Sequence, residues 1–233
     1  MGGLFARSRS RFLQRQMVWW PTPLGWFCGM LAASACILSW TFLAEDWLSL
    51  TAREPAKVLV VEGWIGLGGV KASANEFMTG NYDLVVTTGG LTGERWNTER
   101  WNYAEMGAKE IRRLGVPPEK ILIARAREIE SQRTFEAAVA AWHTLQANNL
   151  RPAAINVMTR GPHARRSRLI YEKVFGSETK IGVIGWIPAS EQGTRWWGSS
   201  DRASELIKES VGYPFELLLN SGRSSNSPHQ PAR

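Results

Sequence analysis

The residues best suited to chemistry begin with a basic block, "TRGPHARRSR" at residues 159 to 168, directly after the apolar run "AAINVM". The block contains His163, one of three histidines in the 233-residue chain, and Arg166 three positions later. An imidazole moves protons near neutral pH, and a guanidinium holds phosphate or carboxylate oxygens through paired hydrogen bonds. The pair predicts acid–base chemistry on an anion, against the plainer interpretation of a surface histidine and a solvated arginine face.

Two earlier apolar runs also end in residues that suit a ligand site. Glu62 and Gly63 follow "KVLVV", and Thr88, Gly89 and Gly90 follow "DLVVT". A carboxylate at such an end either caps a neighbouring helix or serves as an acid or base. The two glycines either form a tight turn or let the backbone approach a ligand closely.

These run ends must be positioned by the elements around them. Short apolar runs rich in β-branched residues predict strands that are buried on both faces. The predicted strands cover residues 57–64, 82–90, 119–125, 153–161 and 180–186. Segments with helical spacing lie between and after them, at residues 69–79, 97–114, 131–148, 162–175 and 199–219.

Two of these helices carry signals at their ends. In the segment 97–114, Tyr103, Met106, Ile111 and Leu114 can share one face, and Gly115 follows the last turn. Glycine at this position is typical of a helix end. Ser131 is the expected N-cap of the next helix.

Strands that alternate with helices predict a Rossmann-like three-layer α/β domain with a mainly parallel sheet of five or more strands. In such a fold the ligand crevice lies beyond the carboxyl ends of the strands. The run ends named above therefore converge on one site. We predict that His163 and Glu62 are catalytic and that Gly63, Thr88, Gly89, Gly90, Thr159 and Arg166 bind the substrate.

An uncharged segment near the N-terminus predicts a membrane helix. Leu24 to Ala44 is 21 residues long, and a helix of that length spans about 30 Å, the thickness of a bilayer's hydrocarbon. Arginines precede it and Glu45 and Asp46 follow it, which places the N-terminus in the cytoplasm. A cleaved signal peptide is the weaker alternative, because the apolar run continues past the small residues at 32–35. A lipoprotein at Cys36 is weaker still.

The predicted organisation is a basic cytoplasmic tail (1–17), a transmembrane signal anchor (18–46), an α/β domain (50–220) and a disordered tail (221–233). We expect a single-pass protein of the bacterial inner membrane, with residues 24–44 in the lipid bilayer and the domain outside the cytoplasm. No cysteine follows Cys36, so neither a disulfide nor a catalytic thiol is expected in that domain.

Charge and motif searches exclude several classes of function. The net charge is +7, but Arg7, Arg9, Arg11 and Arg15 precede the apolar segment and leave +3 elsewhere, so no nucleic-acid partner is expected. The chain lacks a phosphate loop and a dinucleotide fingerprint, and it lacks the nucleophile elbow of α/β-hydrolases. No metal site and no cofactor are expected.

The blocks "TTGG", "LGVPPEKI", "RTFEAA", "INVMT" and "GPHARRS" occur in an order and spacing that resembles the SanA/YdcF/ElyC-type family, the domain of unknown function 218. The resemblance covers roughly residues 57 to 217. It implies one membrane helix, a role in envelope and peptidoglycan-related processes, and no agreed reaction. It also implies that Thr134, the pair His163 and Arg166, and the turn at Gly89 and Gly90 belong to the site.

The sequence departs from the family pattern at three places. The first strand ends in "VVEGW" rather than in a glycine-rich turn, and Tyr103 and Ala137 stand where the family has an acidic residue and an asparagine. A carboxylate from Glu62, Glu94 or Glu99 is expected to compensate.

Two classes of function follow. One is an enzyme, a hydrolase or transferase that acts on a phosphate-bearing, lipid-linked or nucleotide-like envelope intermediate. The other is a non-catalytic scaffold or ligand sensor of cell-wall assembly.

Overall fold

The computed structural model describes residues 20–91, 101–128 and 132–219. The chain divides into two compact units, Met1–Phe42 and Leu43–Arg233. The first unit contains most of the helix α1 (Pro23–Leu48), whose last six residues belong to the second unit.

Helix α1 is long and apolar enough to cross a membrane, and it is the one such helix among the described residues. Large apolar side chains such as Leu24, Leu31 and Ile37 are more than 60% exposed along it. A helix that is apolar on all sides and not covered by protein suits a lipid environment. Length and composition therefore fit a single-pass membrane protein.

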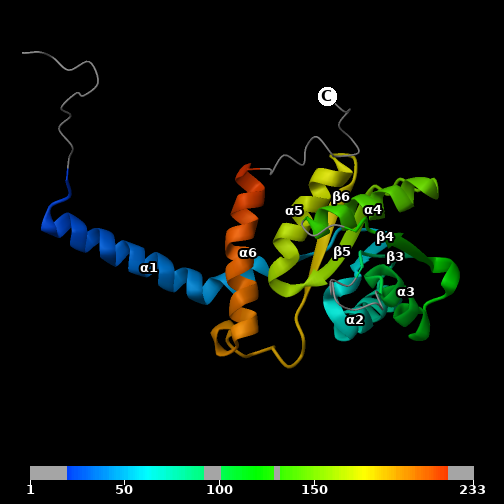
Figure 1. Ribbon diagram of the computed structural model, residues 1–233, viewed down its shortest axis with the longest axis horizontal. Coiled ribbons are helices and arrows are strands. Elements are labelled where there is room, and N and C mark those ends of the chain that lie inside the picture. Colours follow the sequence, from blue (N-terminus) through cyan, green and yellow to red (C-terminus); the bar gives the residue numbers. More distant parts are fainter. Residues whose placement is uncertain (1–19, 92–100, 129–131, 220–233) are drawn as a thin grey trace, which may run out of the picture. The chain divides into compact units, whose positions relative to one another are not determined.

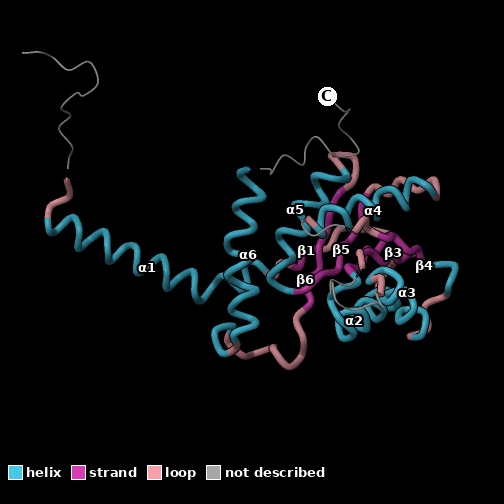
Figure 2. The backbone as a smooth tube through the Cα atoms, in the orientation of Figure 1, coloured by secondary structure: helices cyan, strands magenta, loops and turns pink. Residues whose placement is uncertain are grey.

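The second unit is built on a six-stranded sheet in the order β1-β6-β5-β2-β3-β4. The strands are β1 (Thr51–Ala52), β2 (Val58–Glu62), β3 (Leu84–Gly89), β4 (Ile121–Arg125), β5 (Ala154–Arg160) and β6 (Lys180–Trp186). All pairings are parallel except that of β1, which runs antiparallel to β6 at one edge (Figure 2).

Helices cover both faces of the sheet (Figure 1). They are α2 (Gly66–Thr79) and α3 (Tyr103–Arg113) on one face, and α4 (Arg133–Ala147) and α5 (Ala164–Phe175) on the other. Strand β2 serves both layers because its side chains alternate: Val58 and Val60 pack with α4 and α5, and Leu59 and Val61 with α2 and α3. This confirms the predicted Rossmann-like three-layer domain.

The last helix, α6 (Ser200–Leu219), runs alongside α5 (Figure 1). It follows a loop that leaves β6 and a short 3-10 turn, η4 (Trp196–Gly198). It lies outside the two helical layers on the sheet.

The apolar face predicted for α3 is only partly buried. The helix buries Ala104, Gly107, Ala108 and Ile111, whereas Met106 is 45% exposed. The small residues face the sheet because they let the helix approach its backbone closely. The predicted stop is confirmed, since Gly115 has φ +100°, a conformation that suits glycine.

Strand order places the site. Strands β2 and β5 are neighbours in the sheet. From β2 the chain continues to β3 and β4 on one side, and from β5 it continues to β6 on the other. The carboxyl ends of β2 and β5 therefore border the crevice that is typical of doubly wound folds. Glu62 ends β2, and Arg160 ends β5 and leads into the 3-10 turn η3 (Gly161–His163).

Candidate functional site

A cleft of about 730 Å³ lies at the carboxyl ends of the strands. Residues from the ends of β3 and β4, the start of α4, the turn η3, α5 and the first half of α6 line it. Five residues predicted from the sequence are among them: Gly89, Gly90, Thr134, His163 and Arg166. Residues that are up to 77 positions apart in the chain thus meet at one cavity.

His163 lies between a hydroxyl and a carboxylate. Its Nε2 is 3.1 Å from Thr134 Oγ1, and its Nδ1 is 3.0 Å from Glu209 Oε1. The imidazole is 5% exposed, and the ring of Trp64 packs edge-on against it with centroids 5.2 Å apart. We call this arrangement the Thr134–His163–Glu209 chain.

The charge of Glu209 decides which nitrogen of His163 carries the proton. Burial alone would raise the pKa of Glu209, but hydrogen bonds from Arg166 and His163 outweigh it and lower the pKa to about 2. Arg166 Nη2 also lies 3.1 Å from Nδ1, but it can only donate, and its contact with Glu209 Oε1 is shorter at 2.8 Å. An ionised carboxylate only accepts hydrogen bonds, so we assign the Nδ1 proton to the contact with Glu209. In the neutral imidazole Nε2 is then unprotonated and accepts from Thr134, which is the geometry of a general base beside a hydroxyl.

Arg166 holds Glu209 in place. Its Nε is 2.6 Å from Glu209 Oε2, and its Nη2 is 2.8 Å from Oε1, a two-pronged contact. Burial alone would lower the pKa of Arg166, but the hydrogen bonds to Glu209 outweigh it and leave the pKa raised. Most of the guanidinium is therefore occupied, and its main contact is with the residue that orients His163.

Glu62 lies behind the cleft wall. It is fully buried and accepts hydrogen bonds from Thr159 Oγ1 at 2.5 Å, Trp64 Nε1 at 3.1 Å and Ser167 Oγ at 3.2 Å. Neither Glu62 nor Thr159 is among the residues that line the cleft. Glu62 thus fixes Trp64, which does line the cleft and packs on His163.

Of the remaining predicted residues, some line the cleft and others are buried behind it. Gly89 lines the cleft at φ +152°, where a side chain would meet Tyr103. Thr88 is buried and donates to the Ala137 carbonyl at 2.8 Å, and Gly63 is buried where a Cβ would meet the backbone carbonyl of Tyr103. Thr88 and Gly63 therefore do not line the cleft.

Three predicted residues lie outside the described residues: Glu94, Glu99 and the expected N-cap Ser131.

Positive charge in the cleft comes mainly from residues that the sequence reasoning missed. Arg127, Arg133 and Lys208 line the cleft with exposed side chains, and none forms an ion pair with another described residue. Arg127 follows β4, Arg133 begins α4 and Lys208 lies on α6. Unpaired guanidinium and ammonium groups around a cavity attract anions, phosphates above all.

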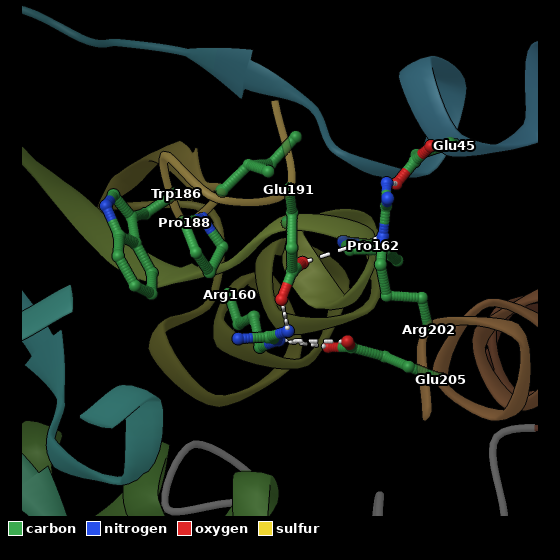
Figure 3. Close-up of a pocket in the computed structure, with 10 residues that line it drawn as sticks. Glu45, Arg160, Pro162, Trp186, Pro188, Glu191, Arg202 and Glu205 are labelled. Carbon is green, nitrogen blue, oxygen red and sulfur yellow. Dashed lines mark hydrogen bonds and ion pairs between the residues drawn. The ribbon is translucent and has the colours of Figure 1, made fainter. Parts of the chain in front are cut away.

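Arg160, in contrast, is already neutralised within the protein. It contacts Glu191 at 2.8 Å and Glu205 at 2.9 Å, and Arg202 joins Glu191 to Glu45 (Figure 3). The small cavity beside this network measures about 10 Å³ and holds about one water molecule. The network therefore ties β5, α6 and the last turns of α1 together rather than forming a second ligand site.

No group of three metal-ligating side chains occurs among the described residues. A scan of protein-family models found no match to this chain, and a search of curated proteins found none either.

Proposed function

We propose that this chain is a membrane-anchored envelope enzyme, a hydrolase or transferase, whose α/β domain acts on a phosphate-bearing substrate in cell-wall biogenesis. The observation that carries the proposal is His163, held in the cleft between Thr134 and an ionised Glu209. A histidine oriented by a carboxylate on one nitrogen and facing a hydroxyl on the other is equipped to move a proton.

The charge of the cleft supports a phosphate-bearing substrate. Arg127, Arg133 and Lys208 offer cationic groups that form no ion pair with a described residue, and they outnumber the two exposed carboxylates of the lining, Glu128 and Asp201. The cleft volume of about 730 Å³ accommodates a nucleotide-like or lipid-linked head group, since ligand pockets commonly measure about 300 to 1,000 Å³. In this proposal His163 transfers the proton, and Glu62 acts through Trp64 as a positioning residue.

In this proposal the domain lies outside the cytoplasm. Arginines before the apolar helix and acidic residues after it support a cytoplasmic N-terminus in the bacterial inner membrane. The resemblance to the SanA/YdcF/ElyC-type family supports a role in the envelope.

Ligand binding by the full chain in detergent micelles tests the proposal. We expect the protein to bind farnesyl pyrophosphate and not farnesol, as measured by isothermal titration calorimetry. Replacing Arg127 and Arg133 by Gln is expected to weaken binding at least about tenfold, since charged hydrogen bonds contribute about 1.5 kcal/mol or more each. The control is Arg168→Gln, because Arg168 pairs with Glu172 at 2.9 Å and does not line the cleft.

Catalysis is tested separately from binding. His163→Gln is expected to retain pyrophosphate binding and to abolish phosphate release from farnesyl pyrophosphate. If the wild-type chain binds farnesyl pyrophosphate but releases no phosphate from it, or from any lipid pyrophosphate that copurifies with the chain, the non-catalytic sensor is favoured. Equal binding of farnesol and farnesyl pyrophosphate would refute the phosphate-bearing substrate.

A further inference from the structure

The outward face of α6 is apolar. Ile207, Val211, Phe215 and Leu218 are 58%, 66%, 49% and 78% exposed. Their spacing of four, four and three residues places them on one side of the helix. Soluble proteins rarely leave such a continuous apolar stripe uncovered.

The opposite face of α6 is ionic. Arg202, Glu205, Glu209 and Glu216 form ion pairs with Glu45, Arg160, Arg166 and Lys173 respectively. Glu209 and Glu216 are each 2% exposed. A surface helix normally buries its apolar side and exposes its charges. Helix α6 does the reverse, which is expected where the outer medium is itself apolar.

Helix α6 packs on the last residue of the uncharged segment 24–44 and on residues that directly follow it. Ala44 and Leu48 are fully buried in a cluster with Leu206, and Trp47 packs edge-on against Tyr213 with centroids 5.3 Å apart. These residues all belong to the second unit. Chain continuity therefore keeps α6 within about two helical turns of the end of the membrane segment.

The exposed residues from Ile207 to Leu218 include a single charged side chain, Lys208. An amphipathic helix that lies in a bilayer interface combines an apolar stripe with basic residues at its border, where they meet lipid phosphates. Residues 220–233, "NSGRSSNSPHQPAR", include no large apolar residue.

We propose that the outer face of α6 lies in the interface of the bilayer that residues 24–44 enter, so that the domain is held against the membrane at two places. This inference is independent of the reaction in the cleft. It commits to lipid as the occupant of the stripe, and a second copy of the chain is the main alternative.

Site-directed fluorescence on the full chain in phosphatidylcholine–phosphatidylglycerol vesicles tests it. Cys28 and Cys36 are first replaced by Ser, and a single cysteine is introduced by Val211→Cys and labelled with the environment-sensitive dye NBD. The matched control is Ala147→Cys, an exposed position at the end of α4. Two quenchers are compared, a lipid with a nitroxide on its acyl chain and iodide in the water.

We expect the label at position 211 to be quenched at least twofold more strongly by the nitroxide lipid than by iodide, and the label at 147 to show the reverse. Equal iodide quenching at both positions would overturn the proposal. Protection from both quenchers at 211, together with a 211–211 cross-link between chains, would also overturn it and would identify a protein interface. Because both substituted positions are exposed, neither substitution is expected to disturb folding.

Discussion

Two of the buried carboxylates, Glu62 and Glu209, are linked to His163, and the molecule holds them in different ways. Glu62, at the end of β2, accepts hydrogen bonds from two hydroxyls and an indole, all neutral donors. Glu209, on α6, faces the guanidinium of Arg166 and the imidazole of His163. Both are nearly inaccessible, with exposures of 0% and 2%. The two sites differ in whether the charge is balanced locally.

The two carboxylates differ in how they reach His163: Glu62 acts on it indirectly, and Glu209 contacts it. Of the three hydrogen-bond donors to Glu62, only Trp64 lines the cleft, so the hydrogen bonds of Glu62 reach His163 through the packing of an indole. Glu209 contacts the imidazole directly and fixes which nitrogen is protonated. Of the two carboxylates, Glu209 is therefore the one whose loss should change both the stability of the fold and the position of the proton on His163.

The largest effect is expected for Glu209→Gln. The substitution leaves the charge of Arg166 largely buried without a counter-charge, and breaking a buried pair in this way costs about 3 kcal/mol or more. Urea unfolding of the full chain in detergent, followed by tryptophan fluorescence, measures the loss. Glu172→Gln is the control, because its pair with Arg168 is solvent-exposed and should contribute less than about 1 kcal/mol. Equal losses for the two variants would contradict this account of Glu209.

Acid titration of stability is the second test. The pKa of Glu209 is lowered from 4.5 to about 2 in the folded protein, so its ionised form stabilises the fold above the unfolded value. The contribution, about 3 kcal/mol from this difference, is lost as the pH falls through about 2. The gap in unfolding free energy between the wild type and Glu209→Gln should therefore narrow between about pH 5 and pH 2. A gap that stays constant with pH would show that packing, rather than charge, is lost in the variant.

Glu62→Gln should cost less, about 1 kcal/mol. If the Gln oxygen stands at the Oε2 position, Thr159 and Trp64 can still donate to it, and the Ser167 hydroxyl can rotate to accept from the new amide at the Oε1 position. No cation is left unpaired, so the cost is that of exchanging neutral hydrogen bonds. The same urea titration measures it. A cost equal to that of Glu209→Gln would mean that the longer-range attraction between Glu62 and Arg166 contributes as much as the direct pair of Arg166 with Glu209.

The contrast between the two carboxylates also shows what sequence can predict. Glu62 was predicted as a site residue because it ends an apolar run, and the carboxyl end of a parallel strand has a known place in the fold. Glu209 carries no such signal. It lies 43 residues after Arg166 and 46 after His163, on a helix whose packing depends on tertiary structure.

The five long strands followed from their apolar, β-branched runs to within a few residues at each end, whereas β1 was missed because a two-residue strand is too short to form such a run. Helix α3 shows a second limit. Apolar spacing favoured a face with Met106, but the buried face contains Gly107, whose Cα side lies directly against Gly63 and Thr87. Within the cleft, the sequence predicted the glycines at the end of β3 and the basic turn after β5. The cations Arg127, Arg133 and Lys208 were not predicted, because an exposed charge in a sequence is usually only solvated.

Helix α6 connects the cleft to the membrane in the two proposals. Its first half lines the cleft with Asp201, Ser204 and Lys208, and its inner face supplies Glu209. If its outer face lies in the bilayer interface, the cleft borders the lipid head groups. A substrate that carries its phosphate on a lipid would then reach His163 without leaving the membrane, which favours a lipid-linked substrate over a free nucleotide.

The smallest effect on stability is expected for Thr134→Ala, which removes the hydroxyl of the Thr134–His163–Glu209 chain and leaves both carboxylates intact. Thr134 is half-buried, and its hydrogen bond to His163 should contribute about 1 kcal/mol or less to stability. Because Glu209 still binds Nδ1, the imidazole should keep its orientation, and the fold should be nearly unchanged. Phosphate release should nevertheless fall at least tenfold if Thr134 takes part in proton transfer, and Thr134→Ser should restore it because the hydroxyl returns. Loss of stability comparable to that of Glu209→Gln would instead show that the orientation of His163 depends on both of its neighbours.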